Sequence, residues 1–127
     1  EFTIFEHDAI VVNHIPRHIP YKEVISIGKP SYGGHIDLKS FGVNPLTSKR
    51  YFPGAHAYRL RPVGAKKLID QAKICAKPTD IYLNLDTFPN LQEYYPWPVE
   101  AKDTFTTIQK RQGCLAKHNY DETYKII

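Results

Sequence analysis

Three consecutive polar residues interrupt an apolar, β-branched stretch near the start of the chain, and their side chains are well suited to chemistry. Glu6, His7 and Asp8 lie between the apolar residues 2–5 and 9–12, which suggests a turn or bulge between two extended pieces. In an extended segment the side chains of Glu6 and Asp8 point to one side and that of His7 to the other. Two carboxylates at a strand end can hold Mg²⁺ or Mn²⁺ and leave positions for water and substrate phosphates. The alternative is a solvent-exposed acidic turn that binds nothing.

A second group of candidate residues comes at the start of another expected strand. Residues 55–61 alternate in a way that places His56 and Tyr58 on one face. Gly54 precedes them, and a glycine there lets a ligand approach the backbone closely. His56 can complete a metal site or bind phosphate, and the alternative is a hydrogen-bonded histidine of the core.

The elements that must position these residues are short strands and one clear helix. Pro62 suits the first turn of a helix, and the residue before Pro78 is biased out of the helical region. Apolar residues recur at helical spacing between them, and Thr79 or Asp80 can cap a further short helix. The sequence predicts strands at 2–5, 9–12, 23–28, 55–61 and 99–101, and loops at 29–53 and 86–98. It predicts helices at 62–77 and 81–84, with a strand as the alternative at 81–84.

Composition bounds the class of protein. The chain has 127 residues, 42% of them hydrophobic and 24% charged, which is ordinary for one folded α/β domain. The longest apolar run is too short to span a membrane. The net charge is +4, but the basic residues are scattered along the sequence, which favours an ordinary solvated surface over a nucleic-acid-binding face. Cys75 and Cys114 are interpreted as free thiols in a reducing, cytoplasmic compartment, with a single bridge between them left open.

The order of these motifs resembles glycosyltransferase family 25, which includes lipooligosaccharide and collagen galactosyltransferases. In that family a strand ends in a Glu-Asp-Asp motif, a Gly-x-x-Ala-Tyr strand runs into a Gly-Ala-Lys-Lys-Leu helix, and a Pro-Val-Asp turn follows. This chain has Glu6-His7-Asp8, residues 54–58, residues 64–68 and Pro78-Thr79-Asp80 in the same order. The resemblance covers residues 2–108 and is most specific over residues 54–69. Because the middle acid is replaced by His7, a metal role falls to Glu6 and Asp8.

The resemblance implies a partial GT-A-like α/β sandwich with a mixed sheet and long loops. Residues 1–127 would be the carboxyl-terminal half of such a domain, with 110–127 as a polar tail and the first βα units lying upstream of Glu1. The implied reaction transfers a sugar from a nucleotide-diphosphate donor, expected to be UDP-linked, to a hydroxyl of a glycan or other acceptor. Glu6 and Asp8 would hold Mn²⁺ or Mg²⁺, which neutralises charge on the departing diphosphate.

The resemblance also suggests roles for the remaining candidates. A carboxylate must take the acceptor's proton; Asp80 is the first choice and Glu100 the second, and capping of a helix is the other role open to Asp80. Gly54, His56 and Tyr58 are expected to contact the donor. Two other classes of function stay open: a non-catalytic binding module that keeps the fold, and a small basic domain that binds nucleic acid.

Overall fold

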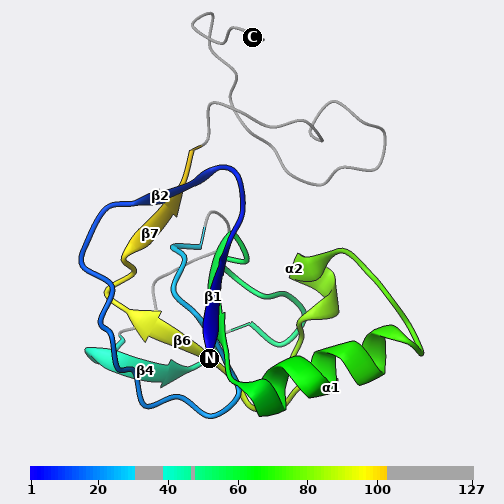
Figure 1. Ribbon diagram of the computed structural model, residues 1–127. Coiled ribbons are helices and arrows are strands. Elements are labelled where there is room, and N and C mark those ends of the chain that lie inside the picture. Colours follow the sequence, from blue (N-terminus) through cyan, green and yellow to red (C-terminus); the bar gives the residue numbers. More distant parts are fainter. Residues whose placement is uncertain (31–38, 47, 103–127) are drawn as a thin grey trace, which may run out of the picture.

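The computed structural model describes residues 1–30, 39–46 and 48–102. Cys114 and the predicted polar tail at 110–127 lie outside these residues. The elements in chain order are β1 (Phe2–Phe5), β2 (Ala9–Val11), β3 (Val24–Ser26), β4 (Gly42–Pro45), β5 (Ala57–Leu60), α1 (Pro62–Ala72), α2 (Thr79–Tyr82), β6 (Leu91–Tyr95) and β7 (Val99–Ala101). The expected mixed α/β class is confirmed, with strands as the larger part (Figure 1).

Seven strands form two sheets in the described part of the chain. The larger has the order β1-β5-β3-β6-β4, and β2 pairs with β7 in a separate two-stranded sheet. β5 is antiparallel to both β1 and β3, whereas β3 and β6 are parallel, and β4 is antiparallel to β6. The strands β1, β3 and β6 therefore run in the same direction and end at the same edge of the sheet.

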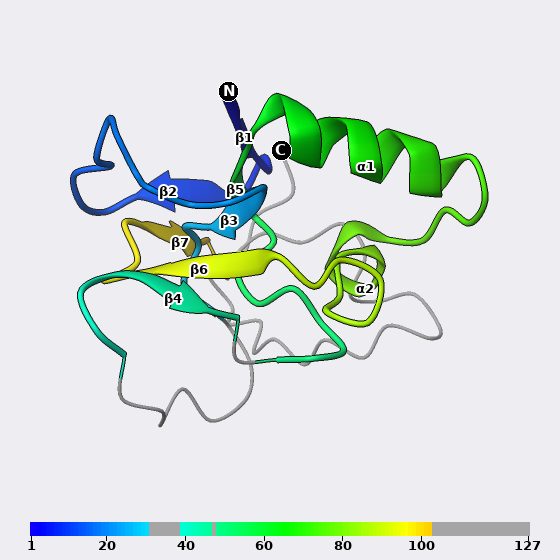
Figure 2. The same cartoon turned by 90° about the horizontal axis from the view of Figure 1, so that it is seen from below.

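The two faces of the large sheet bury different side chains. On one face Val24, Tyr58 and Leu60 pack with residues from α2 and the loops beside it. On the other face Ile25 and Ala57 pack with residues of the 15–21 segment and of β7. Figures 1 and 2 agree with this division, because both helices lie at one side of the molecule and the β2–β7 pair at the opposite side.

Two strands appear where the sequence predicts loops. β4 lies within the predicted loop at 29–53 and β6 within that at 86–98. The composition of β4, Gly-Val-Asn-Pro, is typical of a turn, and its pairing with β6 makes it a strand. The local prediction was wrong here because a tertiary contact overrides weak local propensity.

The long helix is shorter than predicted and less deeply packed. α1 ends at Ala72, so Cys75, an exposed free thiol, lies beyond it. Of the apolar residues at helical spacing, Leu68 packs against the core whereas Ile69 is 58% exposed. The residue that α1 buries is Gly64, against the backbone of Glu23 and the side chain of Val24. No helix in the described ranges has the length and apolar character needed to cross a membrane.

A glycine–glycine contact joins the loop before β5 to the end of β3. Gly54 has a φ of +70°, and a Cβ built on it would lie 1.9 Å from the carbonyl oxygen of Gly28. Gly42 also has a positive φ, +98°, but a Cβ built there would meet nothing within 4 Å. A side chain at Gly42 would therefore cost backbone strain alone, whereas a side chain at Gly54 would cost both backbone strain and a steric clash.

We predict that Gly54→Ala destabilises the fold by about 3 kcal/mol, because strain and a clash with rigid backbone add together. Gly42→Ala should cost only about 1–2 kcal/mol, the cost of the left-handed conformation alone. Urea denaturation of both variants measures the difference. Equal losses in the two variants would show that the Gly28–Gly54 contact is not tight.

Candidate functional site

One edge of the five-stranded sheet gathers most of the predicted residues. Glu6 directly follows β1 and Gly28 closely follows β3 at this edge, and Gly54 and His56 precede β5 there. In open α/β sheets, ligands bind outside the carboxyl ends of parallel strands. We call this edge, where β1, β3 and β6 end, the site edge.

The acidic triplet lies in a turn between β1 and β2, which we call the acid turn, residues 6–9. The amide of Ala9 donates to the carbonyl of Glu6 at 3.1 Å, which closes the turn. The amide of Glu6 donates to the carbonyl of His56 at 2.8 Å, and the carbonyl of Asp8 accepts from the amide of Lys102 at 2.7 Å. The turn expected between the two strands is therefore present, and the alternation of side chains that an extended segment would give does not apply to residues 6–8.

The carboxylates of the acid turn nevertheless share an electrostatic environment with Asp80. The pKa of Glu6 is raised above its usual range, first by partial desolvation and then by the negative charges of Asp8 and Asp80, with His7 opposing the shift. Burial raises the pKa of Tyr58, and the charge of Glu6 adds to this effect. Residues from three separate parts of the chain thus lie within electrostatic reach of Glu6.

Asp80 reaches this neighbourhood through the packing of α2. The carbonyl of Asp80 accepts a hydrogen bond of 2.8 Å from the amide of Phe52. The Phe52 ring packs edge-on against Tyr58, with the ring centroids 5.6 Å apart. Neither Thr79 nor Asp80 is the N-cap of this helix, because Pro78 occupies that position. The carboxylate of Asp80 accepts a hydrogen bond of 3.0 Å from the amide of Ile81 in the first turn.

Asp8 carries a buried oxygen that suits a cation. Its Oδ1 atom is buried and has no hydrogen-bond partner among the described residues, an arrangement that costs free energy unless an ion or water is bound. Within residues 1–30, 39–46 and 48–102, no group of three or more His, Cys, Asp or Glu side chains is arranged to hold a metal. Mg²⁺ commonly uses one or two carboxylates together with waters and substrate phosphates. Asp8, with Glu6 as the other carboxylate of the acid turn, is therefore the candidate ligand.

The three residues predicted to contact the donor have different surroundings. Gly54 makes its close approach to the backbone of Gly28. His56 is 6% exposed, and its Nε2 atom lies 3.4 Å from the carbonyl oxygen of Val99, which agrees with the alternative of a hydrogen-bonded core histidine. Tyr58 is 8% exposed and lies near Glu6. Contact of these residues with a donor stays a prediction.

Glu100 belongs to a different part of the structure. It lies on β7 opposite Ile10 of β2, and its carboxylate forms an ion pair of 2.7 Å with Lys29. Both side chains of the pair are about half exposed. Of the two predicted proton acceptors, Asp80 is the one whose charge acts on the acid turn.

The sequence analysis missed a buried ion pair on the same face of the sheet as Tyr58. Lys39 Nζ lies 2.5 Å from Glu93 Oε1, and both side chains are less than a tenth exposed. The register places Tyr58, Ser26 and Glu93 side by side on β5, β3 and β6. The sequence does carry a signal for this pair. In a strand, Leu91, Glu93 and Tyr95 point to the same face, so Glu93 is expected beside apolar side chains on the buried face of the sheet.

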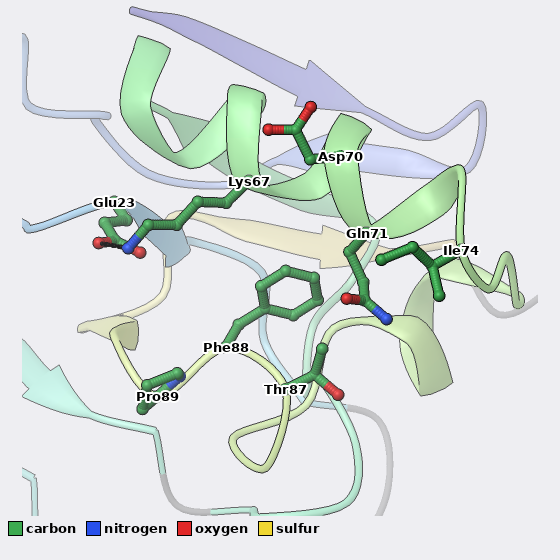
Figure 3. Close-up of a pocket in the computed structure, with 8 residues that line it drawn as sticks. All are labelled: Glu23, Lys67, Asp70, Gln71, Ile74, Thr87, Phe88 and Pro89. Atoms are coloured by element: carbon green, nitrogen blue, oxygen red, sulfur yellow. Dashed lines mark hydrogen bonds and ion pairs between the residues drawn. The ribbon is translucent and has the colours of Figure 1, made fainter.

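A shallow hollow of about 350 Å³ lies beside α1 (Figure 3). Lys67 extends from the helix to Glu23, with Nζ 2.5 Å from Oε1, and the ring of Phe88 faces the hollow. No residue of the acid turn lines it. The third charged residue of the lining, Asp70, pairs with Lys66. This hollow is therefore separate from the candidate site.

The raised pKa of Glu6 makes stability depend on pH. The folded state holds the proton of Glu6 more tightly than the unfolded state does, so stability falls as pH rises through the usual value of 4.5 and through the raised value. We predict that Glu6→Gln, which removes this penalty, has a higher Tm than the wild type at pH 7 and an equal Tm at pH 3.5. Thermal unfolding with a metal chelator present measures both.

The control for this prediction is Asp86→Asn, which removes the same charge at an exposed position. An equal rise in Tm for both variants would assign the effect to net charge alone. A Tm that falls at pH 7 in Glu6→Gln would contradict the proximity of Glu6 to Asp8 and Asp80.

Comparison of the chain with protein-family models, with curated proteins and with solved structures finds no match. The resemblance to glycosyltransferase family 25 therefore rests on the motifs quoted from the sequence. The function is inferred from the geometry and the electrostatics of the acid turn, Tyr58 and Asp80.

Proposed function

We propose that this chain is part of a metal-dependent glycosyltransferase of the family 25 type, with a GT-A-like α/β sandwich. The reaction is the transfer of a sugar from a nucleotide-diphosphate donor, expected to be UDP-linked, to a hydroxyl of an acceptor. The observation that supports it is that the charges of Asp8 and Asp80 both act on Glu6, which directly follows β1 at the edge where parallel strands end.

The acid turn is the proposed binding site for Mn²⁺ or Mg²⁺. Asp8 offers a buried oxygen that has no hydrogen-bond donor among the described residues. Glu6 would be the second ligand of the ion. Burial is the first cause of the raised pKa of Glu6, and repulsion by Asp8 and Asp80 is the second. A cation would relieve the repulsion. When bound, the ion would supply charge neutralisation for a departing diphosphate.

Asp80 is the proposed general base. Its carboxylate would accept the proton of the acceptor hydroxyl while that oxygen bonds to the anomeric carbon of the donor sugar. The bond between the anomeric carbon and the diphosphate oxygen breaks, and the nucleoside diphosphate leaves. The hydrogen bond from the amide of Phe52 to the carbonyl of Asp80 fixes the backbone of this residue. The hydroxyl of Tyr58, on which the charge of Glu6 acts, would hydrogen-bond a ligand there.

A thermal-shift measurement tests the proposal. Mn²⁺ together with UDP should raise the Tm of the wild type, because a ligand that binds only the folded state stabilises it by mass action, by about 2.7 kcal/mol at a hundred times Kd. Asp8→Asn should abolish the shift, since an amide cannot replace the anionic ligand. The exposed control Asp86→Asn should keep it.

The pattern of responses separates the candidate classes. No shift with Mn²⁺ and any of UDP, GDP or CMP would contradict the transferase proposal and favour a binding module without transfer activity. A shift that persists in Asp8→Asn would place the nucleotide elsewhere. A strongly salt-dependent affinity for DNA or RNA would instead indicate a nucleic-acid-binding domain.

A further inference from the structure

An exposed aromatic ring lies at the site edge, on the far side from the acid turn. Phe41 directly precedes β4 and is 85% exposed. Its ring contacts that of Tyr95 edge-on at 6.0 Å between centroids, and Tyr95 contacts Trp97 edge-on at 5.0 Å. We call Phe41, Tyr95 and Trp97 the aromatic platform.

The backbone that carries Phe41 is held on both sides. Lys39 is fixed by its buried ion pair with Glu93. The side chain of Asn44 accepts a hydrogen bond from the amide of Ser40 at 3.1 Å and donates one to the carbonyl of Ser40 at 2.8 Å. A rigid segment that presents an exposed apolar ring is preorganised for binding, since little conformational entropy is lost when a ligand arrives.

The aromatic platform and the acid turn belong to the same edge of the sheet. The strands β1 and β6 end at this edge, and β4 and β5 begin there. Three inter-strand spacings separate β1 from β6 in the strand order, which corresponds to about 14 Å. An oligosaccharide of two or three rings can extend over such a distance.

The chemistry of the surface points to a sugar ring. A pyranose has an apolar face of C–H groups that packs on an aromatic ring, and hydroxyls at its rim that stay in water. Phe41 offers an exposed apolar face, whereas Tyr95 and Trp97 are half-buried and support it from the side. Among the described residues, the charged pair next to the aromatic platform is Lys39–Glu93. Both side chains of this pair are buried, so neither presents its charge to a ligand on the platform.

We infer that the aromatic platform binds a hexopyranose ring of the acceptor glycan. The ligand's identity as the acceptor rests on the proposed function. Binding of a hexopyranose to Phe41 is a separate property, and it can be measured without nucleotide or metal.

Trp97 provides the readout, because it is the only tryptophan of the chain. We predict that titration of the full chain with lactose, cellobiose and maltose gives a saturable change in tryptophan fluorescence for at least one disaccharide, with a Kd in the millimolar range. Sorbitol, an open-chain polyol without a ring face, should give none. Phe41→Ala should weaken binding about tenfold, the equivalent of one aromatic contact, and Phe41→Tyr should retain it.

A matched control is available at the opposite edge of the sheet. Phe2 begins β1 and is 49% exposed, so Phe2→Ala removes an exposed phenylalanine without touching the platform and should leave sugar binding unchanged. No saturable change with any of the three disaccharides would overturn the inference. So would equal losses in Phe41→Ala and Phe2→Ala, or a change in self-association, measured by sedimentation, as the only effect of Phe41→Ala.

Failure of this inference is distinguishable from failure of the proposed function. The shift in Tm with Mn²⁺ and UDP should persist in Phe41→Ala, because the acid turn is unchanged. A nucleotide shift without sugar binding contradicts the aromatic platform alone. Sugar binding without a nucleotide shift contradicts the transferase proposal and leaves a carbohydrate-binding surface.

Discussion

The pairing of β5 with two neighbours at once is the constraint on which the rest of the structure depends. Because β5 is antiparallel to both β1 and β3, these two strands run in the same direction, and β6 joins them parallel to β3. The ends of three strands therefore meet at one edge. Reversal of the β1–β5 pairing would carry the acid turn away from the start of β5. Reversal of the β3–β5 pairing would instead carry the ends of β3 and β6 to the opposite edge.

The same constraint explains why charge is concentrated there. The amide of Glu6 bonds to the carbonyl of His56, so the acid turn is fixed to the start of β5, and Tyr58 follows on that strand. Phe52 contacts both Tyr58 and the backbone of Asp80. Asp80, far from Glu6 in sequence, is thereby kept close enough for its charge to raise the pKa of Glu6. Such an arrangement costs stability, and a bound cation would offset this cost.

Much of the fold is readable from the sequence because β-branched runs and proline act locally. The strands β1, β2, β3, β5 and β7 and the start of α1 at Pro62 follow from such signals. β4 does not, since its strand conformation comes from pairing with β6 rather than from its composition. Glu6 and Asp8 stand out because they interrupt an apolar stretch. Nothing in the local sequence brings Phe41 to Tyr95, because their contact depends on the register between β4 and β6.

The proximity of Glu6, Asp8 and Asp80 is tested most directly by measuring the pKa of Glu6. Side-chain carboxyl NMR shifts, followed through a pH titration, report this value residue by residue. The pKa of Glu6 should lie above its usual value of 4.5 in the wild type and move back toward it in Asp80→Asn, but not in Asp86→Asn. A Glu6 that titrates at its usual value, and does not respond to the loss of the Asp80 charge, would contradict the account.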